Sequence, residues 1–226
     1  MRKITIALLL ALMTMPAAAR EGGYIQGFYS LADAGDLGIN DGTVTSGSLT
    51  ISQSSDDEGN AIGLAGGYLF DNGLGIEAGF ARFNDFGVDA TLTASNAVVG
   101  GDTLDGTIST SQDIEGDMFY LAPVAYLDLS PVMLKAKIGA AYFDVENQST
   151  VSGSGTVNGS AISGSVTLDA ISESGTSLLL GLGAEYALTE NVSAMVEYMR
   201  IQDVGGGELS ETDIDTLNFA LVYYIE

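Results

Sequence analysis

The feature that most constrains this chain is an alternation of apolar with small or polar residues, which recurs in stretches of about ten residues beyond residue 20. In a β-strand, successive side chains point to opposite faces, so each stretch has one apolar and one polar face. A tilted strand of about 9–11 residues crosses a bilayer, and no segment beyond residue 20 has the roughly 18 uninterrupted apolar residues of a spanning helix. The sequence therefore predicts an all-β protein that crosses a membrane with strands.

Eight alternating segments can be drawn, and the connections between them alternate in length. The segments lie near residues 23–31, 60–70, 74–83, 117–129, 132–143, 177–188, 192–201 and 215–226. Tight turns at 71–73, 130–131 and 189–191 alternate with longer polar segments that begin near Ala32, Asn84 and Glu146 and with a short one near Asp203. This asymmetry is typical of outer-membrane barrels. We therefore expect an eight-stranded antiparallel transmembrane β-barrel with short periplasmic turns and long extracellular loops. A ten-stranded barrel is the alternative.

The long connections are rich in Ser, Thr and Gly, yet parts of them favour β-structure. Thr43–Ser52 and Ser149–Asn158 are the clearest cases. One interpretation is that strands continue beyond the membrane as a polar ribbon. Partial disorder is the other, because segments rich in Gly, Ser and Asp bury little apolar surface. The sequence leaves both interpretations open.

The N-terminus has the pattern of a secretory signal peptide. Arg2 and Lys3 precede the short apolar run Ile4–Met15, and Ala17–Ala19 form a small-residue cleavage site. We predict a signal peptide at residues 1–19 and an outer-membrane β-barrel domain at residues 20–226. A retained anchor is the alternative, although the apolar run is short for a membrane span.

The composition excludes several classes of function. The chain has no Cys and no His, so it has no disulfide, no thiolate metal site and no catalysis by imidazole. Two of its seven Lys+Arg lie in the predicted signal peptide, which leaves five against 30 Asp+Glu, a net charge of −25. Such an acidic chain is not expected to bind nucleic acid. We expect no enzyme, no cofactor and no metal site. The acidic segments Asp36–Gly42 and Asp56–Gly59 match no EF-hand and are interpreted as turns, with Ca²⁺ binding as the alternative.

The polar faces of several segments carry charge. These residues are Glu77, Lys135, Lys137, Glu185 and Glu197. The interior of an eight-stranded barrel is only just wide enough for side chains. We therefore expect an ion-pair network inside the barrel, in which carboxylates oppose the two ammonium groups and fill the lumen. A proton or ion path is the alternative.

Two arginines, Arg82 and Arg200, fall on the lipid-facing side by the same alternation. Both are at the loop-side ends of their segments, where an arginine costs only ~0–1 kcal/mol compared with ~2–4 kcal/mol at the bilayer midplane. We expect them to contact phosphates of outer-leaflet lipids, including lipopolysaccharide. Simple placement at the barrel rim is the alternative.

Five parts of the chain carry a resemblance to a known family: Gly23–Tyr29, Gly66–Glu77, Leu182–Asn191, Val196–Tyr198 and the last alternating segment. Together they resemble the OmpA-like family of small outer-membrane β-barrels, which includes the OmpX and opacity-protein types. The resemblance covers residues 20–226. It implies a monomeric barrel in the bacterial outer membrane, inserted by the outer-membrane assembly machinery. One departure weakens the expected assembly signal, because such barrels usually end in an aromatic residue and this chain ends in Ile225–Glu226.

These observations favour a non-enzymatic surface protein. The barrel would be an anchor, and the long acidic loops would support envelope integrity or adhesion by binding an extracellular ligand. A narrow channel or uptake pore for small or apolar solutes is the first alternative. A soluble, exported β-sandwich adhesin is the second.

Overall fold

A computed structural model describes residues 21–35, 41–129, 131–204 and 212–225. Nearly all of them are in β-strands, and within these ranges no helix is long and apolar enough to cross a membrane. The strands are β1 (Gly22–Asp33), β2 (Gly42–Ser46), β3 (Leu49–Asp56), β4 (Glu58–Leu69), β5 (Leu74–Val99), β6 (Asp102–Asp128), β7 (Val132–Val157), β8 (Ser160–Thr167), β9 (Ile171–Ala187), β10 (Val192–Val204) and β11 (Thr212–Ile225). The predicted signal peptide at residues 1–19 lies outside the described residues.

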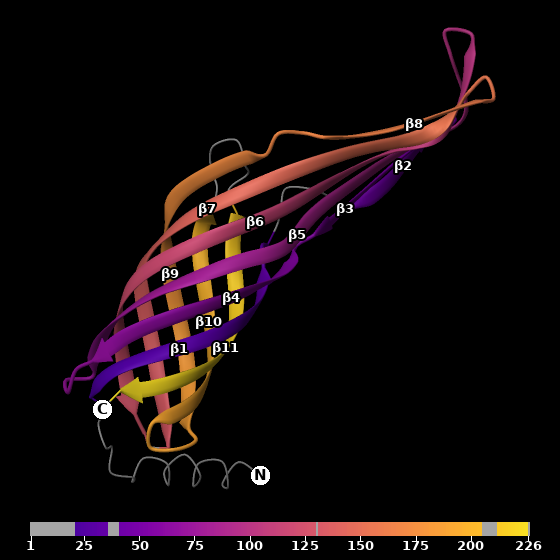
Figure 1. Cartoon of the computed structure of the whole chain (residues 1–226). Coiled ribbons are helices and arrows are strands. Elements are labelled where there is room, and N and C mark those ends of the chain that lie inside the picture. The colour runs from indigo at the N-terminus through magenta and orange to yellow at the C-terminus, as the bar shows by residue number, and fades with distance from the viewer. Residues whose placement is uncertain (1–20, 36–40, 130, 205–211, 226) are drawn as a thin grey trace, which may run out of the picture.

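Eight of these strands form a closed antiparallel ring (Figure 1). The order around the ring is β5-β4-β1-β11-β10-β9-β7-β6, and β6 pairs back onto β5. The first and last strands of the chain close it side by side, from Gly23 opposite Ile225 to Asp33 opposite Asp215. Over the described residues, each alternating segment of the sequence lies in one of these strands to within one residue at its end. The predicted eight-stranded antiparallel barrel is therefore confirmed, and the ten-stranded alternative is not observed.

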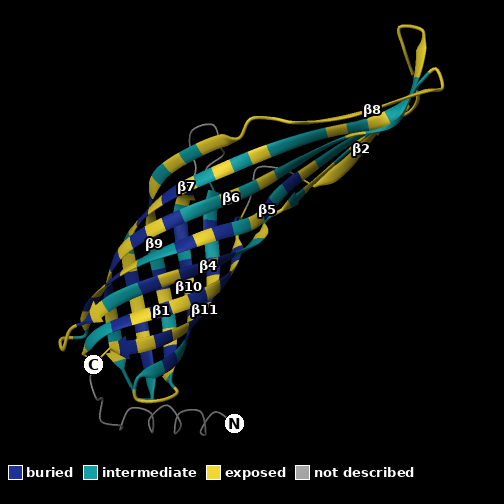
Figure 2. Cartoon of the chain, viewed as in Figure 1, coloured by how far each residue is buried: buried dark blue, intermediate teal, exposed yellow. Residues whose placement is uncertain are grey.

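The alternation of the sequence becomes an inside and an outside (Figure 2). In β11, for example, Ala220 and Val222 are buried in the ring, whereas Leu221 and Tyr223 are exposed on its outer surface. The other strands of the ring repeat this division, so large apolar side chains form a continuous outer belt. They include Ile25, Ile62, Leu64, Phe119, Leu121, Ile138, Leu182 and Phe219. A belt of this kind matches the hydrocarbon core of a membrane.

Three strands do not end at the mouth of the ring. β5, β6 and β7 continue past it and pair with β3, with each other and with β8 (Figure 1). Together with β2 they form a six-stranded antiparallel sheet in the order β2-β3-β5-β6-β7-β8. We call this part of the structure the projecting sheet. Of the two interpretations of the long connections, the structure shows the polar ribbon for these residues.

A β-bulge connects the two parts of β5. The register with β6 shifts between Phe83 and Phe86, and Asp85 adopts a positive φ of 71° there. The extra residue reverses which side of the sheet each later position faces. As a result Phe86 and Val88 stay buried on the inner side, where Phe83 also lies. The inner face of the projecting sheet is therefore continuous with the barrel interior.

Candidate functional site

Five ionisable side chains meet inside the ring. Glu77 comes from β5, Lys135 and Lys137 from β7, Glu185 from β9 and Glu197 from β10. Each is on the inner face of its strand by the period of two, and none is more than 6% exposed. The structure therefore brings together all five residues that the sequence placed in the lumen.

Ion pairs connect these residues across the interior. Lys137 Nζ lies 2.8 Å from Glu77 Oε1 and 2.9 Å from Glu197 Oε2. Lys135 Nζ lies 2.9 Å from Glu185 Oε2. A buried charge without a partner is very unfavourable, and these distances give each ammonium group at least one carboxylate.

Three tyrosines complete the cluster. The Tyr24 hydroxyl donates to Glu77 Oε2 at 2.6 Å, and the Tyr120 hydroxyl donates to Glu77 Oε1 at 2.7 Å. Tyr224 donates to Glu185 Oε1 at 2.8 Å. The ammonium groups also lie over aromatic rings, Lys135 at 4.3 Å from the centre of the Tyr24 ring and Lys137 at 4.6 Å from that of Tyr120.

These tyrosines are not among the lumen residues expected from the sequence. The signal was present, because Tyr24 is followed at intervals of two by Gln26 and Phe28, which share its inward face. Tyr120 likewise lies between Met118 and Ala122 on the inner face of β6. Alternation therefore places the tyrosine side chains in the barrel interior. Which carboxylate each hydroxyl reaches depends on the register between strands.

Glycines on the inner faces provide the space for these side chains. A Cβ atom on Gly181 would lie 2.7 Å from Lys137 Cγ, and one on Gly79 would lie 2.4 Å from the Tyr120 ring. A Cβ on Gly67 would come within 2.7 Å of the Tyr24 hydroxyl. These strand glycines are therefore required by the close approach of large neighbouring side chains.

The cluster fills the interior with matched charge. Three carboxylates and two ammonium groups are paired with each other and with hydroxyl donors. An eight-stranded barrel holds side chains in its interior but leaves little further space. This arrangement suits a closed lumen that contributes to stability.

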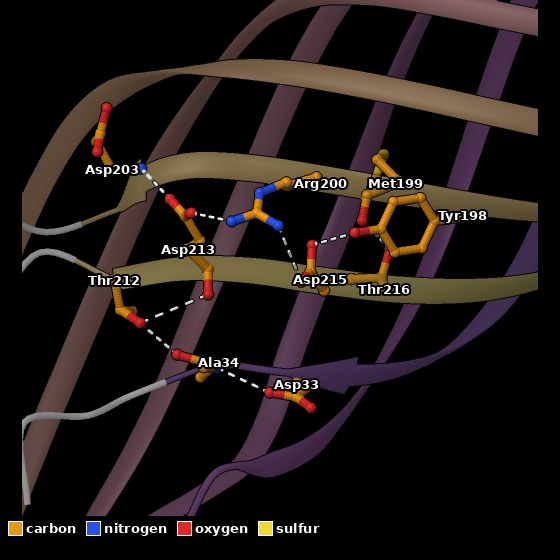
Figure 3. Close-up of polar contacts among 11 residues, drawn as sticks. Asp33, Ala34, Tyr198, Met199, Arg200, Asp203, Thr212, Asp213, Asp215 and Thr216 are labelled. Carbon is orange, nitrogen blue, oxygen red and sulfur yellow. Dashed lines mark hydrogen bonds and ion pairs between the residues drawn. The ribbon is translucent and has the colours of Figure 1, made fainter.

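Arg200 lies at the mouth of the ring, between two aspartates of the neighbouring strand (Figure 3). It pairs with Asp213 and, at 3.5 Å, with Asp215. Asp213 also accepts a 3.1 Å hydrogen bond from the Asp203 amide, so it connects the ends of β10 and β11. The Arg200 guanidinium hydrogen bond lowers the pKa of Asp213.

Arg82 occupies the corresponding place on β5. Its guanidinium lies 3.4 Å from Glu115 Oε2 and 3.9 Å from Asp117 Oδ1 on β6. All three side chains are about half exposed. Each of the two predicted lipid-contacting arginines therefore has carboxylate neighbours at the rim.

The outer face of the projecting sheet carries two complete rows of hydroxyl side chains, one from each of its six strands. In cross-strand order they are Thr43, Ser52, Thr91, Ser109, Ser152 and Ser165, and then Thr45, Thr50, Thr93, Thr107, Ser154 and Ser163. Four neighbouring pairs in these rows hydrogen-bond, among them Thr43 with Ser52 at 3.0 Å and Thr45 with Thr50 at 3.2 Å. A hydroxyl both donates and accepts, so each keeps capacity for an external partner.

The two acidic segments considered as Ca²⁺ sites show no metal-binding geometry in the part of the chain that the structure describes. Residues 36–40 of the first segment lie outside the described residues. Over the described ranges, no group of three or more Asp or Glu side chains is arranged to hold a metal ion.

Comparison with known proteins identifies the architecture. The family model for the outer membrane protein beta-barrel domain matches residues 4–224. A search of curated protein sequences found no match.

The chain is also similar to solved structures. Ail, the attachment invasion locus protein of Yersinia pestis, is 17% identical with a TM-score of 0.50, and the match covers 91% of this chain and all of Ail. Neisserial surface protein A is also 17% identical, with a TM-score of 0.49 over 90% of this chain and 97% of its own. The outer membrane protein OprG of Pseudomonas aeruginosa is 14% identical, with a TM-score of 0.44 over 93% of this chain and all of OprG.

Proposed function

This chain belongs to the outer-membrane protein β-barrel family, and from that membership we propose that it is a non-enzymatic surface protein whose closed barrel anchors an extracellular binding sheet. It resides in the bacterial outer membrane, where proteins of this family span the bilayer with their strands. The apolar belt of the ring faces lipid, and the projecting sheet extends from the side of the long connections.

The observation that carries the proposal is the continuation of β5, β6 and β7 far beyond the apolar belt. A barrel that served only as an anchor would need strands of about 9–11 residues. Here three strands have 26 or 27 residues. Much of the chain therefore forms an ordered surface outside the membrane.

The hydroxyl rows on the outer face of the projecting sheet are the surface that we assign to this contact. A flat array of donors and acceptors suits a neutral, hydroxyl-rich partner such as a surface carbohydrate. A strongly anionic partner is disfavoured, because the chain beyond residue 19 has a net charge of −25.

The test is to shorten the sheet and keep the barrel. Residues 89–111 are replaced by an Asn-Gly turn, which joins β5 to β6 above the ring. We expect the variant to migrate on SDS gels as a closed barrel does, with an unboiled band that shifts on heating. Cells carrying it should lose attachment to carbohydrate-coated surfaces. A matched full-length variant, Thr91→Val with Ser109→Val, removes hydroxyls from the outer face only. Unchanged attachment with the shortened sheet would contradict the proposal.

A narrow channel is the second candidate, favoured by the ionisable groups inside the ring. A channel requires the ion pairs that Lys137 forms with Glu77 of β5 and Glu197 of β10 to separate. Their separation would leave a polar path through the barrel interior. Reproducible conductance of the reconstituted protein, changed by Lys137→Gln, would support it. Silent bilayers would favour the closed anchor.

Lipid contact is proposed at the rim. A guanidinium has five N–H donors, so Arg82 and Arg200 can bind their carboxylates and still donate to a lipid phosphate or to lipopolysaccharide. Weaker retention of lipopolysaccharide by the Arg82→Gln and Arg200→Gln variants, measured by native mass spectrometry, would support this contact. Export through a signal peptide at residues 1–19 and insertion by the outer-membrane assembly machinery are further parts of the proposal. The monomer that the family resemblance implies is kept here only for the ring, in which one chain closes each barrel.

A further inference from the structure

We propose that the inner face of the projecting sheet is an interface with a second copy of this chain. This inference goes beyond the surface role, because binding of an external molecule through the hydroxyl rows needs no second copy. It rests on the chemistry and the shape of the face opposite those rows.

The inner face is apolar across all six strands. Its central row runs through Val44, Ile51, Leu92, Ile108, Gly153 and Gly164 in cross-strand order. The rows on either side add large apolar residues, such as Leu49, Ile162 and Val166. Val44, Ile108 and Ile162 are 69%, 49% and 56% exposed, so the described residues leave this face uncovered. An exposed apolar face of this kind marks an interaction site.

The face has a ridge and a hollow side by side. Ile51, Leu92 and Ile108 form the ridge on β3, β5 and β6. The hollow has a volume of about 620 Å³, and glycines from β6, β7 and β8 form its floor. Two of them, Gly106 and Gly155, face each other so closely that a Cβ on either would lie 2.5 Å from the opposite backbone.

This shape is complementary to itself. In a dimer with two-fold symmetry, both copies use the same patch, and each part of the patch on one copy contacts the opposite part on the other. The ridge of one sheet can then enter the hollow of the other, as in two aligned sheets packed about 10 Å apart. Six strands of about eight residues give a face of roughly 700 Å². A stable interface buries about 800 Å² on each partner.

The distribution of charge favours the inner face as the surface through which two copies of the chain meet. Two molecules of net charge −25 repel one another over most of their surface. The three central rows of the inner face contain no Asp or Glu, whereas Asp89, Asp105 and Asp113 lie on the outer face. The inner face is therefore where two copies can approach without bringing carboxylates together.

The absence of Cys from the chain provides a direct test. Single cysteines replace Ile108 or Ile162 on the inner face, and Ser109 or Ser163 on the outer face of the same strands. A flexible bis-maleimide with a reach greater than the roughly 10 Å between packed sheets is added to outer membranes. We expect at least fivefold more cross-linked dimer from the inner-face cysteines. Equal yields from both faces, or no dimer from the inner face, would overturn the proposal.

A second measurement uses charge. Ile108→Asp with Ile162→Asp is compared with Ser109→Asp with Ser163→Asp, and the mass of the purified full-length protein is measured by light scattering in detergent. We expect a dimer for the unchanged chain and the outer-face pair, and a monomer for the inner-face pair. The heat shift on SDS gels reports that each barrel is folded. A monomeric unchanged chain, or equal dimerisation of both variants, would reject the interface without affecting the attachment experiment.

Discussion

Glu77 and Lys137 form their 2.8 Å ion pair across an intervening strand. Glu77 is on β5 and Lys137 is on β7, and β6 lies between them in the ring. The residue of β6 that faces Glu77 is Ala122, a small and fully buried side chain. On the other side of Lys137, Gly181 of β9 leaves the way open to Glu197 on β10. One lysine therefore connects five consecutive strands of the ring.

Removal of the Lys137 ammonium group should destabilise the barrel strongly. In Lys137→Met, the carboxylates of Glu77 and Glu197 stay buried without their cation. The loss of one partner from a buried ion pair costs ~3–5 kcal/mol. The measurement is the urea midpoint of unfolding in detergent or lipid. Arg82→Gln, which removes a cation from an exposed rim pair, is the control and should change the free energy of unfolding by less than ~1 kcal/mol.

Gly181→Ala should displace Lys137 without removing any charge. The new Cβ would lie 2.7 Å from Lys137 Cγ and 2.8 Å from Cε, so the lysine must move away from its carboxylates. Overpacking of this kind costs ~1–3 kcal/mol. Gly27→Ala, at an exposed position of β1, is the matched control, because the added Cβ would make only an ordinary contact of 3.6 Å with Leu64. Equal stability of the two variants would show that the lysine adjusts freely.

Tyr24→Phe should weaken the cluster by removing one donor from Glu77. A hydrogen bond to a charged group contributes ~1.5–3 kcal/mol. Because Tyr120 donates to the other oxygen of the same carboxylate, the effects of Tyr24→Phe and Tyr120→Phe should not add. A double-mutant cycle on the urea midpoints measures this coupling. Tyr142→Phe, on the exposed outer face, should change stability by no more than ~0.5 kcal/mol.

The rim pair should titrate at acidic pH. Asp213 lies beyond the outer apolar belt of β11, and its hydrogen bond with Arg200 lowers its pKa. A lowered folded pKa contributes stability that is present above the unfolded pKa, about 3.9 for Asp, and is lost as the pH falls through the folded value. The carboxyl carbon of Asp213, followed by NMR, should therefore titrate with a midpoint below about 3.9. Arg200→Gln should raise the midpoint, and an unchanged midpoint would argue against the pair.

Most of the barrel could be predicted from the sequence because a single physical rule controls it. Alternation assigns each side chain to lipid or lumen, and it placed Glu77, Lys137 and Glu197 on inward faces. Tight turns such as 71–73 then fix which strands are neighbours. These patterns are local, so they can be read without knowing the register between distant strands.

The projecting sheet could not be predicted in the same way. Its order depends on β3 pairing with β5, which is a contact between residues far apart in the sequence, whereas β8 pairs with β7 as a local hairpin. The bulge at Asp85 also hides the continuity of β5, because the extra residue breaks the period of two there. The hydroxyl rows likewise become visible only when six strands are set in register.

The unbroken course of β5, β6 and β7 has a mechanical consequence. Backbone hydrogen bonds in an antiparallel sheet run perpendicular to the strands. A pull on the tip of the β5–β6 hairpin acts along the strands, so it loads many of these bonds in shear at the same moment rather than peeling them apart in turn. The tension passes through continuous backbone into the wall of the barrel. A cell held by this sheet would be tethered through a structure built to resist flow.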